Sequence, residues 1–191
     1  MIAGILLAAG AGTRFGGRKL LHPLPSGTPV GVAALRNLRS ALPRVVTVVR
    51  PGDTELRLRL AKERVSIIEC TEADRGMGHS LAAGVAAELG ADGWVIALGD
   101  MPHVRPDTIR AVAQALEQGA ELVVPAFAGQ RGHPVGFGRR FRDHLLALSG
   151  DAGARAILAT HASAVHQLEV DDPGVVQDVD TPADAARLAG A

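Results

Sequence analysis

The sequence has few residues that could stack on bases or form covalent cross-links. It contains four Phe, one Trp and no Tyr, so platforms for stacking nucleic-acid bases are scarce and a nucleic-acid-binding protein is disfavoured. Cys70 is its single cysteine, which excludes an internal disulfide and a metal site built from cysteines alone. No base stands near Cys70 in the sequence, so we predict a buried structural thiol rather than a nucleophile.

Long uncharged runs are also missing. The longest stretch without a charged residue, residues 20–35, contains three prolines and a histidine, so we predict no membrane-spanning helix and no membrane partner. No basic leader precedes the apolar N-terminus, so we expect no signal peptide. Together these absences predict a cytoplasmic protein.

Carboxylates are absent from the first 52 residues, which hold seven Arg or Lys and no Asp or Glu. The rest of the chain holds thirteen basic and twenty acidic residues, so the net charge of zero conceals an asymmetry. A region without carboxylates suits a surface that receives a polyanion, because no local charge opposes phosphate. Since aromatic residues are scarce, a small phosphorylated ligand is favoured over nucleic acid.

Apolar runs typical of strands alternate with helical patterns along most of the chain. The short runs rich in branched residues are residues 2–8, 45–49, 65–68, 94–98 and 122–124. Apolar residues recur every three to four positions in residues 30–42, 53–63, 80–89 and 108–118. This alternation predicts an α/β fold of three layers, with a mostly parallel central sheet and helices on both of its faces.

The alternation fails after Pro125. Residues 127–137 are rich in glycine and predict a loop or hairpin inserted near the sheet edge. Two helical segments and a strand are expected next, over residues 139–148, 152–160 and 164–170. A final helix is predicted to begin at Thr181, where a hydroxyl cap, a proline and a first-turn acid coincide. With 191 residues and no linker, residues 1–191 are expected to form a single domain.

The loop after the first strand is a candidate phosphate site. Its small residues would let backbone amides approach an anion closely. Arg14 could bind two phosphate oxygens at once, and Lys19 would supply a compact positive charge. The alternative is a flexible glycine turn whose basic residues are only solvated.

Two common phosphate motifs do not fit this loop. In a dinucleotide-binding fingerprint, Phe15 would occupy the third glycine position, and no acid appears before Asp53. In a Walker loop, Arg18 interrupts the Gly-Lys pair, and Leu20 replaces the hydroxyl that would hold magnesium. The sequence therefore predicts a phosphate loop of another kind.

Two acids are candidate magnesium ligands. Asp100 follows the strand at residues 94–98, at the carboxyl end where open α/β sheets bind ligands, and a carboxylate is a natural ligand for Mg²⁺. One of the acids Asp178, Asp180 and Asp184 could complete this site, and Asp180 is the preferred one. Each acid also has a local alternative, Asp100 as a turn or cap residue and Asp180 as an acid at a helix N-terminus.

Two further segments are candidates for substrate contacts. The amides around Gly78 and the hydroxyl of Ser80 precede a predicted helix and could hold ribose or base, although Ser80 could equally cap the helix. His133 lies in the glycine-rich segment and could meet a second substrate.

The chain resembles the molybdenum cofactor nucleotidyltransferases, the MobA-like branch of the glycosyltransferase-A-like nucleotidyltransferases. The motifs that carry the resemblance follow one another in family order, over residues 7–19, 76–81, 99–102, 132–137, 150–155 and 178–184. The resemblance implies a Rossmann-like fold of the nucleotide-diphospho-sugar transferase type. It also implies transfer of a nucleoside monophosphate from a triphosphate to a phosphorylated acceptor, with release of pyrophosphate.

Finer expectations follow from the same resemblance. Residues 7–10 read Leu-Ala-Ala-Gly, as in cytidylyl-transferring relatives, so Ala9 favours CTP and a molybdopterin-type acceptor, with a molybdoenzyme as a possible partner. Relatives often carry Asn-Pro-x-aromatic just before the Gly-Met turn, and residues 70–75 lack both the asparagine and the aromatic. The alternatives are a guanylyltransferase, an enzyme acting on a sugar phosphate, and a non-catalytic protein that binds and delivers a nucleotide or cofactor.

The motifs and the resemblance together indicate four kinds of site residue. Arg14, Lys19 and Asp100 are assigned to catalysis, Asp100 and Asp180 to magnesium, and His133 to the acceptor. The residues assigned to the nucleotide follow the first strand or lie near the third helix: Leu7, Ala8, Ala9, Gly10, Gly12, Thr13, Arg14, Lys19, Gly78 and Ser80.

Overall fold

A computed structural model describes residues 1–10, 12, 15, 17–151 and 153–187. Among these residues, eight strands form one sheet with the order β3-β2-β1-β4-β7-β5-β6, and β8 pairs with β5. The strands are β1 (Ile2–Leu7), β2 (Val45–Val49), β3 (Ser66–Glu69), β4 (Gly93–Leu98), β5 (Leu122–Phe127), β6 (Gln130–Arg131), β7 (Val135–Gly138) and β8 (Val165–Glu169).

The first four strands are parallel and form one half of the sheet. β1 is buried along its whole length between β2 and β4, which agrees with its unbroken apolar sequence because parallel strands are covered on both faces. The predicted α/β class, with a mostly parallel sheet between two helical layers, is confirmed.

The glycine-rich segment at residues 127–137 was predicted near the sheet edge, and its position differs. β7 lies inside the sheet, antiparallel to both β4 and β5. Gly136 allows this central position, because a Cβ there would lie 2.9 Å from Val112 of the covering helix. β6 forms the expected hairpin with the end of β5.

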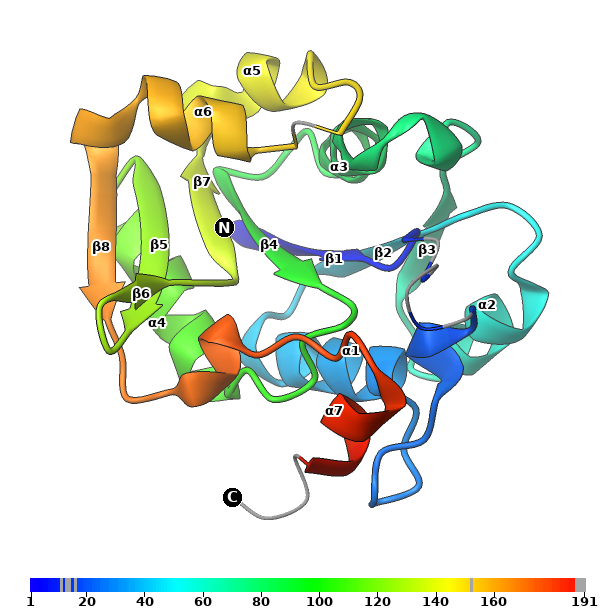
Figure 1. The fold of residues 1–191 in the computed structure, drawn as a ribbon. Helices are drawn as coiled ribbons and strands as arrows, with labels where there is room; N and C mark the ends of the chain where they lie inside the picture. Colours follow the sequence, from blue (N-terminus) through cyan, green and yellow to red (C-terminus); the bar gives the residue numbers. More distant parts are fainter. Residues whose placement is uncertain (11, 13–14, 16, 152, 188–191) are drawn as a thin grey trace.

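Helices cover both faces of the sheet (Figure 1). One layer contains α1 (Val30–Ala41), α2 (Thr54–Ala61) and α4 (Pro106–Glu117), and the other contains α3 (Met77–Ala87), α5 (Arg142–Leu146) and α6 (Arg155–Thr160). Each layer encloses its own apolar core. Trp94 is fully buried in the second core, where its indole N–H donates to the carbonyl of Glu88 at 3.1 Å.

The C-terminal segment crosses back over the carboxyl end of the sheet. It runs from β8 through the short helix η6 (Pro173–Val176) to α7 (Pro182–Arg187), and we call residues 171–181 the C-terminal strap. Thr181 and Asp184 cap α7 reciprocally, since each accepts a hydrogen bond from the backbone N–H of the other. The cap predicted at Thr181 is confirmed.

Among the helices of the described residues, none is both long enough and apolar enough to cross a membrane.

Candidate active site

The carboxyl ends of β1 and β4 bring the first loop and Asp100 together. Leu7 pairs with Leu98 in the sheet, and the N–H of Gly99 extends this pairing by donating to the carbonyl of Leu7 at 2.9 Å. Asp100 therefore leaves the sheet directly beside the loop that follows β1. Lys19 approaches the same point from η2 (Lys19–Leu21), the short helix that ends this loop.

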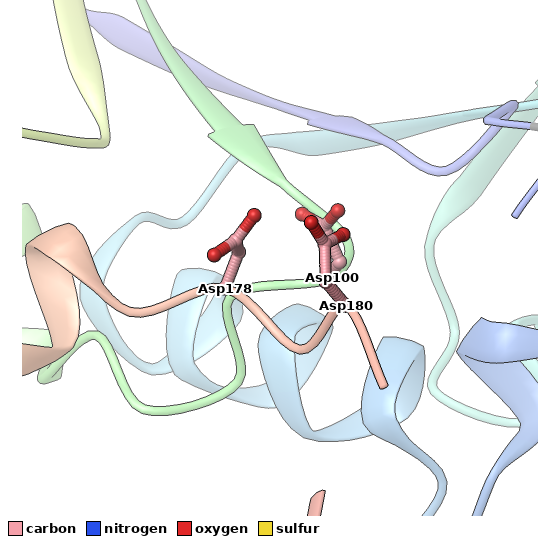
Figure 2. Close-up of side chains that lie close together, drawn as sticks. All are labelled: Asp100, Asp178 and Asp180. Carbon is pink, nitrogen blue, oxygen red and sulfur yellow. The ribbon is translucent and has the colours of Figure 1, made fainter. Parts of the chain in front are cut away.

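The C-terminal strap supplies two more carboxylates (Figure 2). The N–H of Val179 donates to the carbonyl of Asp100 at 2.9 Å, and this bond places Asp178 and Asp180 on either side of the contact. Each of the three aspartates offers a carboxylate oxygen, and these oxygens lie within 4.8 Å of one another. Asp100 thus forms one carboxylate cluster with two aspartates that follow it by 78 and 80 positions in the sequence.

The strap is held at both of its ends. Asp172 is 1% exposed, and its carboxylate accepts hydrogen bonds from the N–H of Arg105 at 2.9 Å, the hydroxyl of Thr108 at 2.6 Å and the N–H of Gly174 at 3.0 Å. At the other end, Val179 is fully buried in a small apolar cluster with residues that flank the start of α1. Burial and hydrogen bonds together fix the position of the strap over the carboxyl end of the sheet.

Lys19 joins two of the three carboxylates. Its Nζ lies 2.8 Å from Oδ2 of Asp100 and 2.7 Å from Oδ1 of Asp180, and its side chain is 11% exposed. Burial by itself would lower the pKa of Lys19, but hydrogen bonds and charge attraction from Asp100 and Asp180 outweigh it and raise that pKa above its ordinary value. The ammonium is therefore charged at neutral pH.

A first cleft of about 750 Å³ opens on one side of this cluster. Its walls come from the loop after β1, the turn after β2 and the start of α3, and they include Ala9, Gly10, Arg50, Asp74 and Ser80. Small side chains on the loop wall leave the backbone accessible, which suits close approach by phosphate oxygens.

A second cleft of about 830 Å³ opens on the other side. Its lining combines apolar residues of β4, β5 and β7 with the basic side chains of Arg131 and Arg155. Lys19, Asp100 and Asp151 line both clefts, so the carboxylate cluster lies where the two clefts meet. Two ligands bound side by side would have their facing ends at this point.

His133 lines the second cleft. Its backbone N–H donates to the carbonyl of Val175 on the strap at 2.8 Å, and its Nδ1 is buried without a hydrogen-bond partner among the described residues. Burial lowers the pKa of the His133 imidazole, while the carboxylates of Asp100 and Asp178 act in the opposite direction. The lowered pKa leaves a neutral ring at pH 7.

The structure brings most of the sequence-predicted residues to the two clefts. Those that line the first cleft are Leu7, Ala9, Gly10, Gly12, Lys19, Ser80 and Asp100, and those that line the second include His133 and Asp180. Ala8 is 1% exposed in the core instead. The N–H of Gly78 is already donated to the carbonyl of Gly150 at 2.8 Å. Thr13 and Arg14 lie outside the described residues.

The side chains of the clefts that were not selected from the sequence include Asp178, which was one of the candidate acids, Arg50 and Asp74. Asp178 had a signal, because residues two apart on an extended segment face the same way, and Asp178 and Asp180 have that spacing. Arg50 directly follows a predicted strand, but no local pattern pairs it with Asp74, which lies in the turn after another strand. Only the folded chain brings these two together.

Comparison with known proteins agrees with this geometry. The fold is that of nucleotidyltransferases of the nucleotide-diphospho-sugar transferase type. Residues 4–166 match the family model of the MobA-like NTP transferase domain, and the chain belongs to this family. It is therefore an enzyme that transfers nucleotides, as the sequence predicted.

Two curated relatives match nearly the whole chain. The purine catabolism protein PucB of Bacillus subtilis is 36% identical over 95% of this chain and 92% of its own length. The protein named nicotine blue oxidoreductase of Paenarthrobacter nicotinovorans is 31% identical over 98% of this chain and 96% of its own length.

A solved structure provides the comparison for the metal. Rv0371c from Mycobacterium tuberculosis H37Rv is 31% identical, with a TM-score of 0.86 over 98% of this chain and 96% of that one. A second structure of Rv0371c, described as a complex with manganese, has a TM-score of 0.81 over 98% of this chain. A divalent metal has thus been observed in a relative of the same fold.

Proposed function

We propose that this MobA-like nucleotidyltransferase moves CMP from CTP to a phosphorylated molybdopterin-type acceptor and releases pyrophosphate, with magnesium as cofactor. The observation that carries the proposal is the position of Lys19, Asp100 and Asp180 where two clefts meet. A transfer between two phosphorylated ligands needs its charge-bearing groups at such a junction. A molybdoenzyme would receive the product.

The carboxylate cluster fits the proposed metal. Hard cations such as Mg²⁺ and Mn²⁺ take oxygen ligands, and the Lys19 ammonium already marks the point between Asp100 and Asp180 where positive charge is stabilised. Asp100 and Asp180 would hold the ion, with Asp178 close enough to assist. A bound Mg²⁺ would neutralise charge on the phosphate oxygens.

The proposed reaction is an in-line displacement at the α-phosphorus of CTP. An oxygen of the acceptor's terminal phosphate forms the new P–O bond, the bond to the bridging oxygen of the β-phosphate breaks, and pyrophosphate leaves with that electron pair. No protein nucleophile or general base is required, because the acceptor phosphate is already an anion. Catalysis then depends on positioning and on stabilising charge on the leaving group.

Each cleft has a role in this scheme. The first cleft would bind CTP along Leu7, Ala9, Gly10, Gly12 and Ser80, which the sequence also indicates as nucleotide contacts. Lys19 would stabilise charge on the leaving pyrophosphate, and Arg14 is proposed to assist it. The second cleft would bind the acceptor, with His133 and the two arginines of its rim near the acceptor phosphate and apolar side chains beneath its ring.

The choice of CTP rests on Ala9, which the resemblance associates with cytidylyl transfer. An oxidoreductase that binds a nicotinamide cofactor is disfavoured. Such a site uses an acidic residue after the second strand to bind the ribose, whereas β2 is followed by Arg50. A different base or a sugar-phosphate acceptor would be revealed by the experiment below.

The test is pyrophosphate release with each of the four common nucleoside triphosphates, with and without Mg²⁺ or Mn²⁺, and with molybdopterin, a sugar phosphate or no acceptor. We expect release with CTP only when both metal and molybdopterin are present. Release with GTP, or with a sugar phosphate in place of molybdopterin, would contradict the proposed substrates. Nucleotide binding without any release would identify a delivery protein.

Asp100→Asn supplies the matched variant. It keeps the shape of the side chain but removes its charge, and losing one such contact costs about 10²–10³ in rate. The control is Asp107→Asn, since Asp107 is an exposed acid that pairs with Arg110 and lies outside both clefts. Equal rates for the two variants would remove Asp100 from the mechanism.

A further inference from the structure

An ion pair lies on the walls of the first cleft, among the residues that line this cleft and not the second. Arg50 follows β2, and its Nε donates to the carbonyl of Ala9 at 3.2 Å. Its terminal nitrogen donates to Oδ1 of Asp74 at 2.5 Å, which lies on the short helix η3 (Ala73–Arg75). Arg50 therefore ties together the first loop and the turn before α3, two walls of the cleft.

The position of this pair within the cleft identifies what it would face. Lys19 and Asp100 line both clefts, so they mark the reacting end of a bound triphosphate. Arg50 and Asp74 line the first cleft alone. A nucleotide whose α-phosphate lies beside the shared residues would extend its base into the part of the first cleft that the second cleft does not share, and Arg50 and Asp74 line that part.

The neighbouring polar groups on this wall have other roles. The carboxylate of Asp53 accepts the N–H of Leu56 as the cap of α2, and Arg18 pairs with Glu55. Cys70, at the start of the segment that departs from the relatives, is 6% exposed in the core. By contrast, the Asp74 side chain is 83% exposed, so its second carboxylate oxygen can accept a hydrogen bond from a ligand.

The chemistry of the pair matches one pyrimidine better than the other. A carboxylate only accepts hydrogen bonds and a guanidinium only donates them. Cytosine presents a 4-amino donor beside the N3 and O2 acceptors. Uracil presents an O4 acceptor beside an N3–H donor, so its O4 would face the carboxylate of Asp74 and its N3–H would face the guanidinium of Arg50.

We propose that Arg50 and Asp74 are the residues that read the base, with Asp74 accepting from the cytosine amino group and Arg50 donating to the ring acceptors. This inference rests on the proposed use of CTP and extends it, because it names the residues that exclude UTP. UTP would be rejected because its O4 would face the carboxylate of Asp74 and its N3–H would face the guanidinium of Arg50, so that neither pair of facing groups could form a hydrogen bond. Such a loss of hydrogen bonds discriminates more strongly than a small difference in shape.

The test compares CTP with UTP in the wild type and in Asp74→Asn. An asparagine amide can either accept from cytosine or donate to O4 of uracil, so we expect the ratio of kcat/KM for CTP over UTP to fall tenfold or more. In parallel, the dissociation constants of CTP and UTP are measured with Mn²⁺ and no acceptor, and their ratio, UTP over CTP, is called the binding ratio. Arg50→Gln should lower both ratios as well. Asp74→Glu keeps the carboxylate, so its ratios should lie between those of Asp74→Asn and the wild type.

Glu72→Gln is the control for this pair. Glu72 lies just before the same short helix, pairs with Arg75 and His79, and lines neither cleft. It should leave the CTP to UTP ratio unchanged. A ratio that is equally unchanged in Asp74→Asn would overturn the inference, as would a wild type that binds both pyrimidine triphosphates equally.

The binding ratio separates this inference from the proposed function. If Asp74→Asn lowers the binding ratio but the wild type transfers nothing to molybdopterin, the base-reading pair stands and the proposed acceptor is wrong. If transfer to molybdopterin occurs and neither ratio depends on Asp74, the proposed function stands and the base-reading pair is wrong.

Discussion

At the scale of single side chains, Lys19 balances the charge of the site. Its ammonium contacts Asp100 and Asp180 at 2.8 and 2.7 Å, and these are the same carboxylates that the proposed metal would use. The lysine and a divalent cation therefore compete for one pair of anions. A triphosphate offers Lys19 other anionic partners, so binding of nucleotide and binding of metal should support each other.

The first prediction concerns Lys19→Met. We expect kcat/KM to fall by about 10²–10³, because a charge contact on the leaving group is lost. In the absence of nucleotide, Mn²⁺ should bind more tightly to this variant than to the wild type, as measured by calorimetry. Lys62→Met, at an exposed position after α2, is the control. Weaker Mn²⁺ binding by Lys19→Met would rule out the competition.

The second prediction concerns His103, which is partly buried beside the strap. Burial lowers the pKa of its imidazole below the ordinary 6.5, so the unfolded chain takes up the proton first as the pH falls. The contribution of His103 to the free energy of unfolding is therefore complete above about pH 6.5, and it decreases as the pH falls toward the lowered pKa.

His103→Gln removes this titration. Between pH 6.5 and 5, the free energy of unfolding should decrease less steeply for the variant than for the wild type in urea titrations. Parallel curves for the two proteins would contradict the assignment of this proton to His103.

At the scale of elements, the C-terminal strap determines whether the site exists. The carboxylates of Asp178 and Asp180 belong to no helix or strand, so their position depends on how the strap is anchored. Asp172 anchors its beginning through three hydrogen bonds, and Val179 anchors its end in an apolar cluster.

The third prediction tests the anchor. Asp172→Ala should lower the free energy of unfolding by about 2–4 kcal/mol, because two backbone N–H groups and a hydroxyl lose a charged partner. It should also weaken Mn²⁺ binding, although Asp172 is not in the carboxylate cluster. Asp171→Ala, at the exposed neighbour, should change neither quantity. Unaltered Mn²⁺ affinity in the folded Asp172→Ala protein would show that the strap needs no such anchor.

The start of α3 offers the fourth prediction. Gly76 has φ = 123°, and a Cβ there would lie 2.2 Å from the carbonyl carbon of Gly150. Gly76→Ala should therefore destabilise the protein by at least about 2 kcal/mol in chemical denaturation, since both the backbone angle and the contact are unfavourable. Gly90→Ala, which has no atom within 4 Å of the added Cβ, should change stability little. Comparable costs for both would refute this account.

At the scale of the whole molecule, the two clefts and the sheet depend on one another. The site combines the ends of β1 and β4, the start of α3, the β6–β7 region and the strap. A ligand that contacts all of these segments binds only the folded chain, and such binding stabilises it according to mass action.

The fifth prediction follows from this linkage. CTP and Mn²⁺ together, at about 100 times the dissociation constant, should add about 2.7 kcal/mol to the free energy of unfolding. Thermal denaturation with and without the ligands measures the effect, and Asp100→Asn should abolish most of it. A full shift in that variant would place the metal elsewhere.

The sequence predicted the individual elements well because their signals are local. The spacing of apolar residues defined α1 and α4 to within two residues at each end, and the branched runs defined the parallel strands. The cap at Thr181 was readable for the same reason, since its partners are three residues apart.

The sequence did not reveal where β7 would lie. Its place between β4 and β5 depends on packing under α4, where Gly136 permits a close approach to Val112. Nothing within residues 127–137 encodes that contact, so the segment looked like an insertion near the edge. The pairing of Arg50 with Asp74 was missed for a related reason, because these two residues lie 24 positions apart in the sequence.

By itself, then, the sequence determined the secondary structure, the class of fold, the family and the residue types available for binding phosphate and metal. The tertiary structure alone decided that Lys19 lies between two carboxylates 80 residues apart, that two clefts share this point and that Arg50 faces Asp74. The physical reason is the range of the forces involved. Backbone preference and apolar spacing act within a few residues, whereas a site is assembled from side chains that only the packing of the whole chain brings together.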